Sequence, residues 1–109
     1  MVVRWSTVAE ERLKNIFNYY FDVASQKVAT RIVSEIIEAC DSLELMPFKA
    51  PVEKDLAGCD LVYRSLVVKK IFKIIYHINL KTDSVLIATI WDCRRSPLLL
   101  KDEISKTLL

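Results

Sequence analysis

Residues 85–91 read VLIATIW, and this run without a single charge constrains the fold more than any other stretch. A strand whose side chains are apolar on both of its faces is typical of the centre of a sheet. The run continues into Asp92, Cys93, Arg94 and Arg95, which places two guanidinium groups at the edge of a core. The chain must therefore provide strands on both sides of residues 85–91.

Two further β-type runs precede this one. Residues 61–68 (LVYRSLVV) and 71–78 (IFKIIYHI) are separated only by Lys69 and Lys70, which predicts a hairpin. Lys-Lys lacks the glycine or asparagine that tight hairpin turns prefer, so the turn type stays open. The apolar face of the second run, which we expect to contact helices, is formed by alternate residues: Phe72, Ile74, Tyr76 and Ile78.

The N-terminal half has the period of helices. After a short β-type run, Thr7 and Glu10 match a capping box, which predicts that a helix starts at Thr7. Ser25 predicts the start of a second helix, and Pro47 lies beyond its end. The two apolar stripes recur every three or four residues: Ala9, Leu13, Ile16, Tyr20 and Val23, then Val28, Ala29, Ile32, Val33, Ile36, Cys40 and Leu43. The short joint between the helices predicts an antiparallel hairpin.

The predicted order is β-α-α-β-β-β, an α+β fold with the helical hairpin packed on one face of a small, twisted antiparallel sheet. A chain of 109 residues is long enough for one modest core, so we expect residues 1–109 to form a single domain. Residues 47–60 hold two of the three prolines and the only glycine, which predicts a loop. The tail, residues 97–109, has the pattern of a short amphipathic segment.

Lys73 is a charge in the middle of an otherwise apolar strand, and such a charge is costly unless it faces water or a ligand. We therefore expect the sheet face opposite the helices to be an open, concave surface that carries Lys73, with Arg64 and Arg94 nearby. The alternative is an ordinary solvated sheet face. His77, the only histidine, has no Ser, Cys or Asp at the spacing of a catalytic triad, so we expect a structural role for it.

Composition argues against several function classes. The three cysteines form no CxxC pair and belong to no cluster with ligand spacing, so we expect reduced thiols and no metal site. No glycine-rich phosphate loop is present, which argues against a nucleotide cofactor. No run suits a membrane span or a signal peptide, and we expect a soluble, cytoplasmic protein.

Charge is unevenly placed along the chain. Residues 1–48 carry five lysines and arginines against seven acidic residues, whereas residues 49–109 carry eleven against seven. A basic second half fits a surface that meets an anionic partner, although charged residues also serve simply to keep a surface in water.

Four segments together match the pattern of a known family. They read VRWSTVAEERLKNIFNYY, ATRIVSEIIEACDSLELMP, DLVYRSLVVKKIFKIIYHIN and VLIATIWDCRRSP, and they cover nearly the whole chain in order. The most specific pieces are W-S-x-x-A before the first helix, Tyr-Arg-Ser-Leu in a strand and Trp-Asp-x-Arg-Arg at the last strand end. This pattern resembles the RelE/ParE superfamily of toxins from bacterial type II toxin–antitoxin modules, of the plasmid-stabilisation type. The resemblance implies the predicted fold and a growth-inhibiting toxin held inactive by an antitoxin.

The superfamily contains two main activities. RelE-like members cut messenger RNA at the ribosome without a metal, and ParE-like members bind DNA gyrase. In the first case the resemblance implies catalytic roles for Arg64, Lys73 and Arg94, because basic side chains stabilise charge on the phosphate. Leu66 and Leu100 depart from the ribonuclease pattern, the second of them near the place of a catalytic Tyr or His. No nearby residue replaces that acid/base group, which favours the ParE-like activity.

Three interpretations follow. The first is a ParE-like toxin that binds a target such as gyrase. The second is a metal-independent, ribosome-dependent endoribonuclease, and the third is a degenerate member that only binds its antitoxin. The residues expected to contact a target are Arg64, Lys69, Lys70, Lys73, Arg94 and Arg95.

The expected partners are an antitoxin and either gyrase or the ribosome with its mRNA, and no membrane. We expect the antitoxin to cover the chain with a helix or an added strand. A dimer and a hetero-oligomer with the antitoxin both stay open. Because neighbours in an extended chain point to opposite sides, Arg94 is expected on the Lys73 face and Arg95 beside Asp92 or in solvent.

Overall fold

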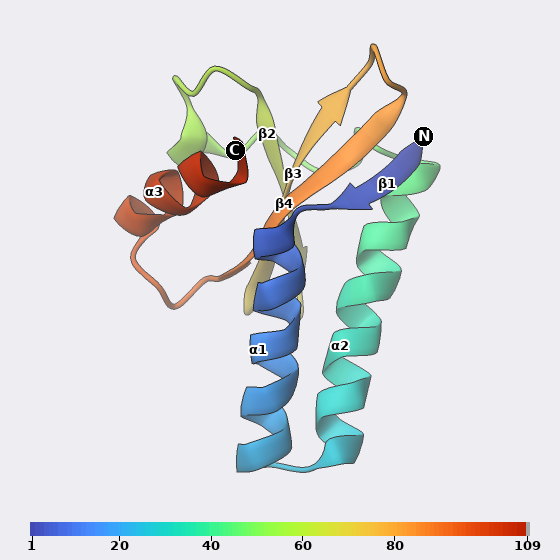
Figure 1. The fold of residues 1–109 in the computed structure, drawn as a ribbon, viewed down its shortest axis with the longest axis vertical. Helices are drawn as coiled ribbons and strands as arrows, with labels where there is room; N and C mark the ends of the chain where they lie inside the picture. Colours follow the sequence, from blue (N-terminus) through green and yellow to red (C-terminus); the bar gives the residue numbers. More distant parts are fainter. Residues whose placement is uncertain (109) are drawn as a thin grey trace.

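The computed structural model describes residues 1–108, and its elements follow the order β1-α1-α2-β2-β3-β4-α3 (Figure 1). Their bounds are β1 Val2–Trp5, α1 Thr7–Val23, α2 Gln26–Asp41, β2 Tyr63–Val68, β3 Phe72–Asn79, β4 Ser84–Asp92 and α3 Leu100–Ser105. Short 3-10 turns lie at Ser42–Glu44, Lys54–Leu56, Pro97–Leu99 and Lys106–Leu108. The predicted α+β fold with its β-α-α-β-β-β order is confirmed, and α3 follows it.

The sheet has the strand order β1-β4-β3-β2, so β4 lies between two strands, as its apolar faces predicted. β2 pairs with β3 and β3 with β4 in antiparallel fashion, but β1 pairs with β4 in parallel. The prediction of a purely antiparallel sheet is therefore wrong. A tight turn sets the relative direction of consecutive strands, whereas β1 and β4 are far apart in the sequence, and tertiary packing decides how they meet.

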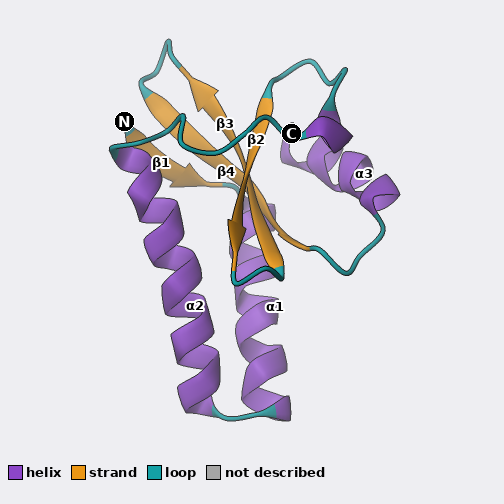
Figure 2. Cartoon of the chain, turned by 180° about the vertical axis from the view of Figure 1, so that it is seen from behind, coloured by secondary structure: helices purple, strands orange, loops and turns teal. Residues whose placement is uncertain are grey.

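The α1–α2 hairpin covers one face of the sheet and extends well beyond the end of that sheet (Figures 1 and 2). Ile36 of α2 and Ile74 and Tyr76 of β3 are fully buried in the core between them. The predicted helix-facing side of β3 is therefore confirmed. Val23, by contrast, is 63% exposed, because the far end of the hairpin has no sheet to pack against.

The opposite face of the sheet is covered, not open as predicted. Leu100 and Ile104 of α3 pack there with Ile75, Ala88 and Trp91, and all five side chains are buried. Apolar side chains on a sheet face need cover from another element, and the amphipathic tail provides it. This face is therefore the side of a second core rather than a concave binding surface.

The N-cap of α1 is Ser6 rather than the predicted Thr7. Ser6 Oγ accepts a hydrogen bond from the Ala9 backbone N–H at 3.0 Å and donates one to the Ala88 carbonyl at 2.6 Å. The serine thus caps the helix and also ties it to β4, a second contact that the local sequence does not show. Ser25 caps α2 as predicted, accepting a backbone N–H at 3.1 Å.

A bulge interrupts the pairing of β3 with β4. Ile75 lies opposite Thr89 and Tyr76 opposite Ile87, so Ala88 has no partner on β3. Ala88 packs into the core on the α3 side, and the Thr89 hydroxyl also points to α3. The bulge therefore aims the Thr89 side chain at the last helix, as bulges commonly do beside functional surfaces.

The β2–β3 turn spans residues 69–71, and its first two residues, Lys69 and Lys70, have a left-handed backbone, with φ of 55° and 60°. Two successive positive φ values are typical of a type I′ turn, which matches the twist of the strands but suits asparagine and glycine. Lys69 pairs with Glu35 of α2 at 2.6 Å, and Lys70 is exposed. The predicted hairpin is confirmed, with a strained turn.

Replacing Lys70 with glycine is expected to raise the free energy of unfolding by roughly 0.5–1 kcal/mol, because glycine adopts positive φ without a clash of its Cβ. Lys70→Ala is the matched control, since it removes the same amine but keeps the strained backbone. Urea unfolding followed by circular dichroism measures both variants. A Lys70→Gly protein no more stable than Lys70→Ala would contradict the strain in this turn.

Candidate functional site

A groove of about 230 Å³ runs between α1 and the end of the sheet where β3 starts and β4 ends. It is lined by Arg12, Asn15, Ile16, Tyr19, Tyr20, Phe72, Ile90, Asp92, Arg94 and Arg95. We name it the arginine groove, because three of these side chains are arginines. Phe72 and Ile90 are buried, so the groove has an apolar wall beside its charges.

Asp92 orients Arg94 at the mouth of the groove. Nε and Nη2 of Arg94 donate to the two carboxylate oxygens at 2.9 and 2.6 Å, and the Arg94 backbone N–H donates to Oδ1 at 2.9 Å. These hydrogen bonds hold the pKa of Asp92 below its usual value and raise the pKa of Arg94. The Arg94 side chain is 63% exposed, and an ion pair that water reaches contributes little to stability. The guanidinium fork is thus preformed and can exchange its carboxylate for an anion of a partner.

Glu103 of α3 links three elements behind the groove. Its carboxylate is 3% exposed and accepts hydrogen bonds from Arg12 of α1 and, at 2.6 Å, from the Thr89 hydroxyl of β4. Arg95 Nη1 lies 3.4 Å from the same carboxylate, and the Arg95 guanidinium stacks 4.2 Å from the centre of the Trp91 ring. One buried carboxylate therefore positions two of the three arginines.

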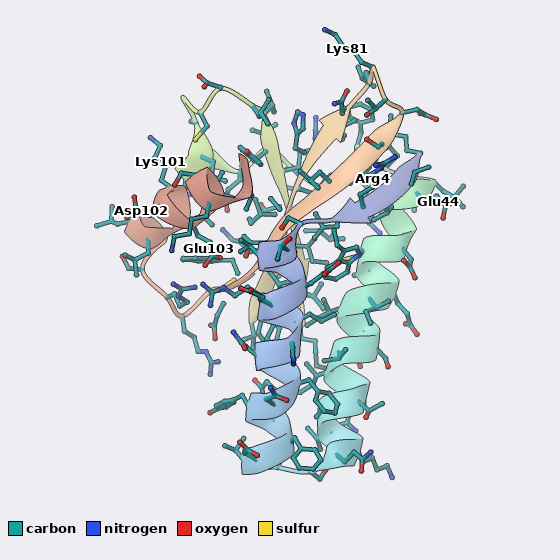
Figure 3. All side chains as sticks on the ribbon, in the orientation of Figure 1. Arg4, Glu44, Lys81, Lys101, Asp102 and Glu103 are labelled. Atoms are coloured by element: carbon teal, nitrogen blue, oxygen red, sulfur yellow. The ribbon has the colours of Figure 1, made fainter. Side chains whose placement is uncertain are left out.

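Glu103 is held in its ionised form despite its burial. Burial raises the pKa of the Glu103 carboxyl, but hydrogen bonds from Thr89 and Arg12 and the nearby positive charges bring it below its usual value. Figure 3 shows Glu103 on the side of α3 that faces α1, whereas Asp102 projects from the outer side of the helix. The negative charge thus stays behind the groove at neutral pH.

Sequence reasoning missed what α1 and α3 contribute to this site. Arg12, Asn15 and Tyr19 are three and four residues apart, which places them on one stripe of α1, and Tyr19 is half exposed. That polar and aromatic stripe, which runs beside the buried stripe of α1, could have indicated from the sequence that α1 contributes to a site. Glu103 gave no signal, because a glutamate on an amphipathic segment ordinarily faces water.

Four of the six residues expected to contact a target gather at one end of the sheet. The backbone N–H of Cys93 donates to the Ile71 carbonyl at 2.7 Å, which brings the β2–β3 turn beside the segment after β4. The four residues are Lys69, Lys70, Arg94 and Arg95. Lys73 is near the same end, opposite Trp91 in the strand register, but it lies on the α3 face, and Arg64 lies farther along β2.

Lys73 lies on the α3 face of the sheet and is paired within the molecule. Its Nζ is 2.6 Å from Oε1 of Glu53, a carboxylate that is itself buried. The hydrogen bond with Glu53 raises the pKa of Lys73 above its usual value. The charge in the middle of β3 is thus explained by a partner in the loop before β2, not by a ligand.

Arg64 lies on the helix face, because it stands opposite Tyr76 in the β2–β3 register. Its guanidinium donates to the Ala50 carbonyl at 2.7 Å and stacks 5.1 Å from the centre of the Phe48 ring. The predicted convergence of Arg64, Lys73 and Arg94 on one concave face is therefore wrong. Strand register decides which face a side chain takes, and the register depends on the pairing of distant segments.

The sides predicted for Arg94 and Arg95 are also reversed. Asp92 lies opposite Phe72, so it points to the helix side, and Arg94 follows it there. Arg95 is the one that reaches the α3 side. The alternation of an extended chain does not apply, because the chain turns after β4, with the Arg95 N–H bonded to the Asp92 carbonyl at 3.0 Å.

The side chains that line the groove are better suited to binding an anion than to transferring protons. Besides its arginines, the ionisable side chains that line it are Asp92, Tyr19 and Tyr20. His77 lies elsewhere, with Nδ1 3.1 Å from the Val62 carbonyl. Cleavage of RNA by its 2′-hydroxyl needs both a base and an acid beside the phosphate, and these side chains are poorly suited to those roles.

Two structural absences hold for residues 1–108. No three His, Cys, Asp or Glu side chains are grouped so as to hold a metal ion. Within the same described part of the chain, no helix is both long enough and apolar enough to cross a membrane.

Comparisons with known proteins point to one family. Residues 3–97 match the family model described as "ParE toxin of type II toxin-antitoxin system, parDE". A solved structure titled "Chromosomal ParDE TA system from P. aeruginosa" contains a similar chain, with a TM-score of 0.70 and 17% sequence identity. The similarity covers 84% of this chain and 95% of that one. No curated protein matches the sequence. At this identity the structural likeness supports the fold alone.

Proposed function

Since the chain belongs to the ParE toxin family of type II toxin–antitoxin systems, we propose that it arrests growth by binding DNA gyrase through the arginine groove. The observation that carries this proposal is the groove itself. Arg94 is held in a preformed fork beside the apolar wall of Phe72 and Ile90, with no obvious acid/base pair near it. Such a site binds a carboxylate or phosphate on a partner surface.

The residue types around the groove suit a protein target. Arginine and tyrosine carry a large share of the binding free energy at protein interfaces, because each combines apolar area with directed hydrogen bonds. Arg94 and Tyr19 are exposed here, and Tyr20 lies beside Tyr19 with 5.1 Å between ring centres. Lys69 and Lys70 extend the cationic surface at the same end of the sheet.

The endoribonuclease interpretation is less well supported. Its three cationic residues, Arg64, Lys73 and Arg94, are distributed over both faces and both ends of the sheet. Lys73 is paired with the buried carboxylate of Glu53, which solvent does not reach, whereas the Arg94–Asp92 pair is exposed. A phosphate would meet only one of the three cations at a time, so the charge stabilisation that the cleavage needs is not assembled.

Two reactions with the purified toxin would test the proposal. Gyrase supercoiling of a relaxed plasmid is expected to be inhibited, and a translation reaction is expected to keep its messenger RNA intact. Cleaved mRNA with uninhibited gyrase would establish the endoribonuclease instead. No effect in either reaction, with an antitoxin still bound, would identify a degenerate member.

The proposal includes an antitoxin that neutralises the toxin and a site of action in the cytoplasm, where gyrase meets DNA. Co-expression with the neighbouring gene product is expected to restore growth. Failure of the two proteins to co-purify would count against that part of the proposal.

A further inference from the structure

Large apolar side chains gather on the surface at the end of β3 that lies farthest from the arginine groove. Figure 2 shows the loop between α2 and β2 crossing the sheet near the β3–β4 turn. Three side chains, one each from this loop, the start of β2 and that turn, are more than half exposed and line one depression: Phe48, Val62 and Leu80. We name these three residues the apolar end. Exposed apolar clusters on a soluble protein commonly mark a binding surface.

The apolar end is held in place by the core beneath it. Tyr76 Oη donates to the Pro47 carbonyl at 2.7 Å, and Arg64 Nη1 donates to the Ala50 carbonyl at 2.7 Å. Tyr76 is fully buried, so the loop is anchored at a fixed point of the sheet. A surface that is already ordered loses little conformational entropy when a partner binds.

A depression of about 120 Å³ marks the centre of this surface. It is lined by Phe48, Val62, Arg64, Ile78 and Leu80. Arg64 is its only charged side chain, and among residues 1–108 it forms no ion pair with a carboxylate. Each arginine of the arginine groove, by contrast, already has an acidic partner.

We propose that the apolar end is the docking surface for the antitoxin. An amphipathic helix of the antitoxin lays its apolar side chains on Phe48, Val62 and Leu80 and places one carboxylate beside Arg64. This inference rests on the proposed function in that a toxin–antitoxin pair is assumed. It goes further in assigning antitoxin and target to opposite ends of the sheet.

The charge of the depression distinguishes this occupant from a second copy of the chain. A symmetric contact places the same patch on both subunits, so two Arg64 side chains would meet without a carboxylate between them. A helix with one apolar stripe and acidic residues along its edge satisfies both the apolar side chains and the guanidinium group. Stable complexes also bury an apolar centre of this kind.

The experiment uses the full-length toxin and the protein encoded by the short gene that adjoins its own. The test variant is Val62→Asp with Leu80→Asp, and Leu98→Asp is the matched control, because Leu98 is 86% exposed and lies outside the apolar end. Isothermal calorimetry is expected to show antitoxin binding at least ~100-fold weaker for the double variant and unchanged for the control. Growth arrest by the double variant alone is expected to match the wild type but to resist rescue by the antitoxin.

Four outcomes would overturn the inference. The double variant could bind the antitoxin with wild-type affinity, or the wild-type toxin could form no complex with it. The double variant could lose toxicity while it still binds the antitoxin, or light scattering could show a wild-type dimer that becomes a monomer in the double variant. Circular dichroism melting checks that the double variant is folded. Absence of gyrase inhibition would refute the proposed target but would not affect the calorimetric measurement of antitoxin binding, so the two failures are distinguishable.

Discussion

Replacing Arg94 with alanine is expected to abolish growth arrest while the protein stays folded and keeps its antitoxin. The Arg94 fork is exposed and preformed at the mouth of the arginine groove. Its removal therefore deletes a bidentate hydrogen-bond donor to the target but no contact within the core. Loss of a central arginine at an interface weakens binding by roughly 30-fold or more. Inhibition of gyrase supercoiling across a range of toxin concentrations measures this effect, and thermal unfolding checks the fold.

Three further variants separate target binding from a merely structural role. Arg94→Lys keeps the charge but loses the planar fork, so it should also be impaired. Asp92→Asn removes the internal partner of Arg94 and should keep toxicity, since a partner's anion then takes its place. Arg95→Ala should lower stability more than toxicity, because Arg95 stacks on Trp91 and faces Glu103. Equal gyrase inhibition by wild type and Arg94→Ala would show that Arg94 does not bind the target and is only a solvated residue at the end of a strand.

Replacing Glu103 with alanine is expected to destabilise the fold by about 3 kcal/mol, because it leaves the buried Thr89 hydroxyl unpaired and two arginines without their carboxylate. Asp102→Ala, on the exposed side of the same helix, is the matched control and should change stability little. Urea unfolding at pH 7 measures both. Equal unfolding midpoints for the two variants would contradict the structural role of the Glu103 carboxylate.

The contribution of Glu103 should also depend on pH. Its folded-state pKa is lowered, so the ionised carboxylate stabilises the fold fully above the unfolded pKa of about 4.3. That stability is lost as the pH falls through the folded-state value. The difference in unfolding free energy between wild type and Glu103→Gln should therefore shrink from pH 6 to pH 3. A constant difference over this range would contradict ionisation of Glu103.

The local parts of the fold could be predicted from short stretches of sequence. The three-and-four spacing of apolar residues and the Ser25 cap predicted the helical hairpin, and the uncharged run before Asp92 predicted the central strand. The two lysines predicted a hairpin turn at the right place, although their left-handed backbone could not be foreseen. These features depend on residues that are neighbours in the chain, where backbone geometry and side-chain period suffice.

The composition of the candidate site was only partly predictable. Arg94 and Arg95 were identified from the strand end, and both line the arginine groove. Arg64 and Lys73 were placed wrongly, because their surroundings are set by the register of β2 against β3 and by the loop that supplies Glu53. A shift of one residue in register moves every side chain of a strand to the other face.

The sequence by itself determined which segments are helices and strands, which strand is central and which cations stand at its end. Only the tertiary structure decided that Arg94 pairs with Asp92 on the α1 side, and that Glu103 is buried behind Arg12 and Arg95. It also decided that β1 joins β4 in parallel. The physical reason is that these contacts join residues far apart in the chain, and the burial of apolar faces by α1, α2 and α3 selects them collectively.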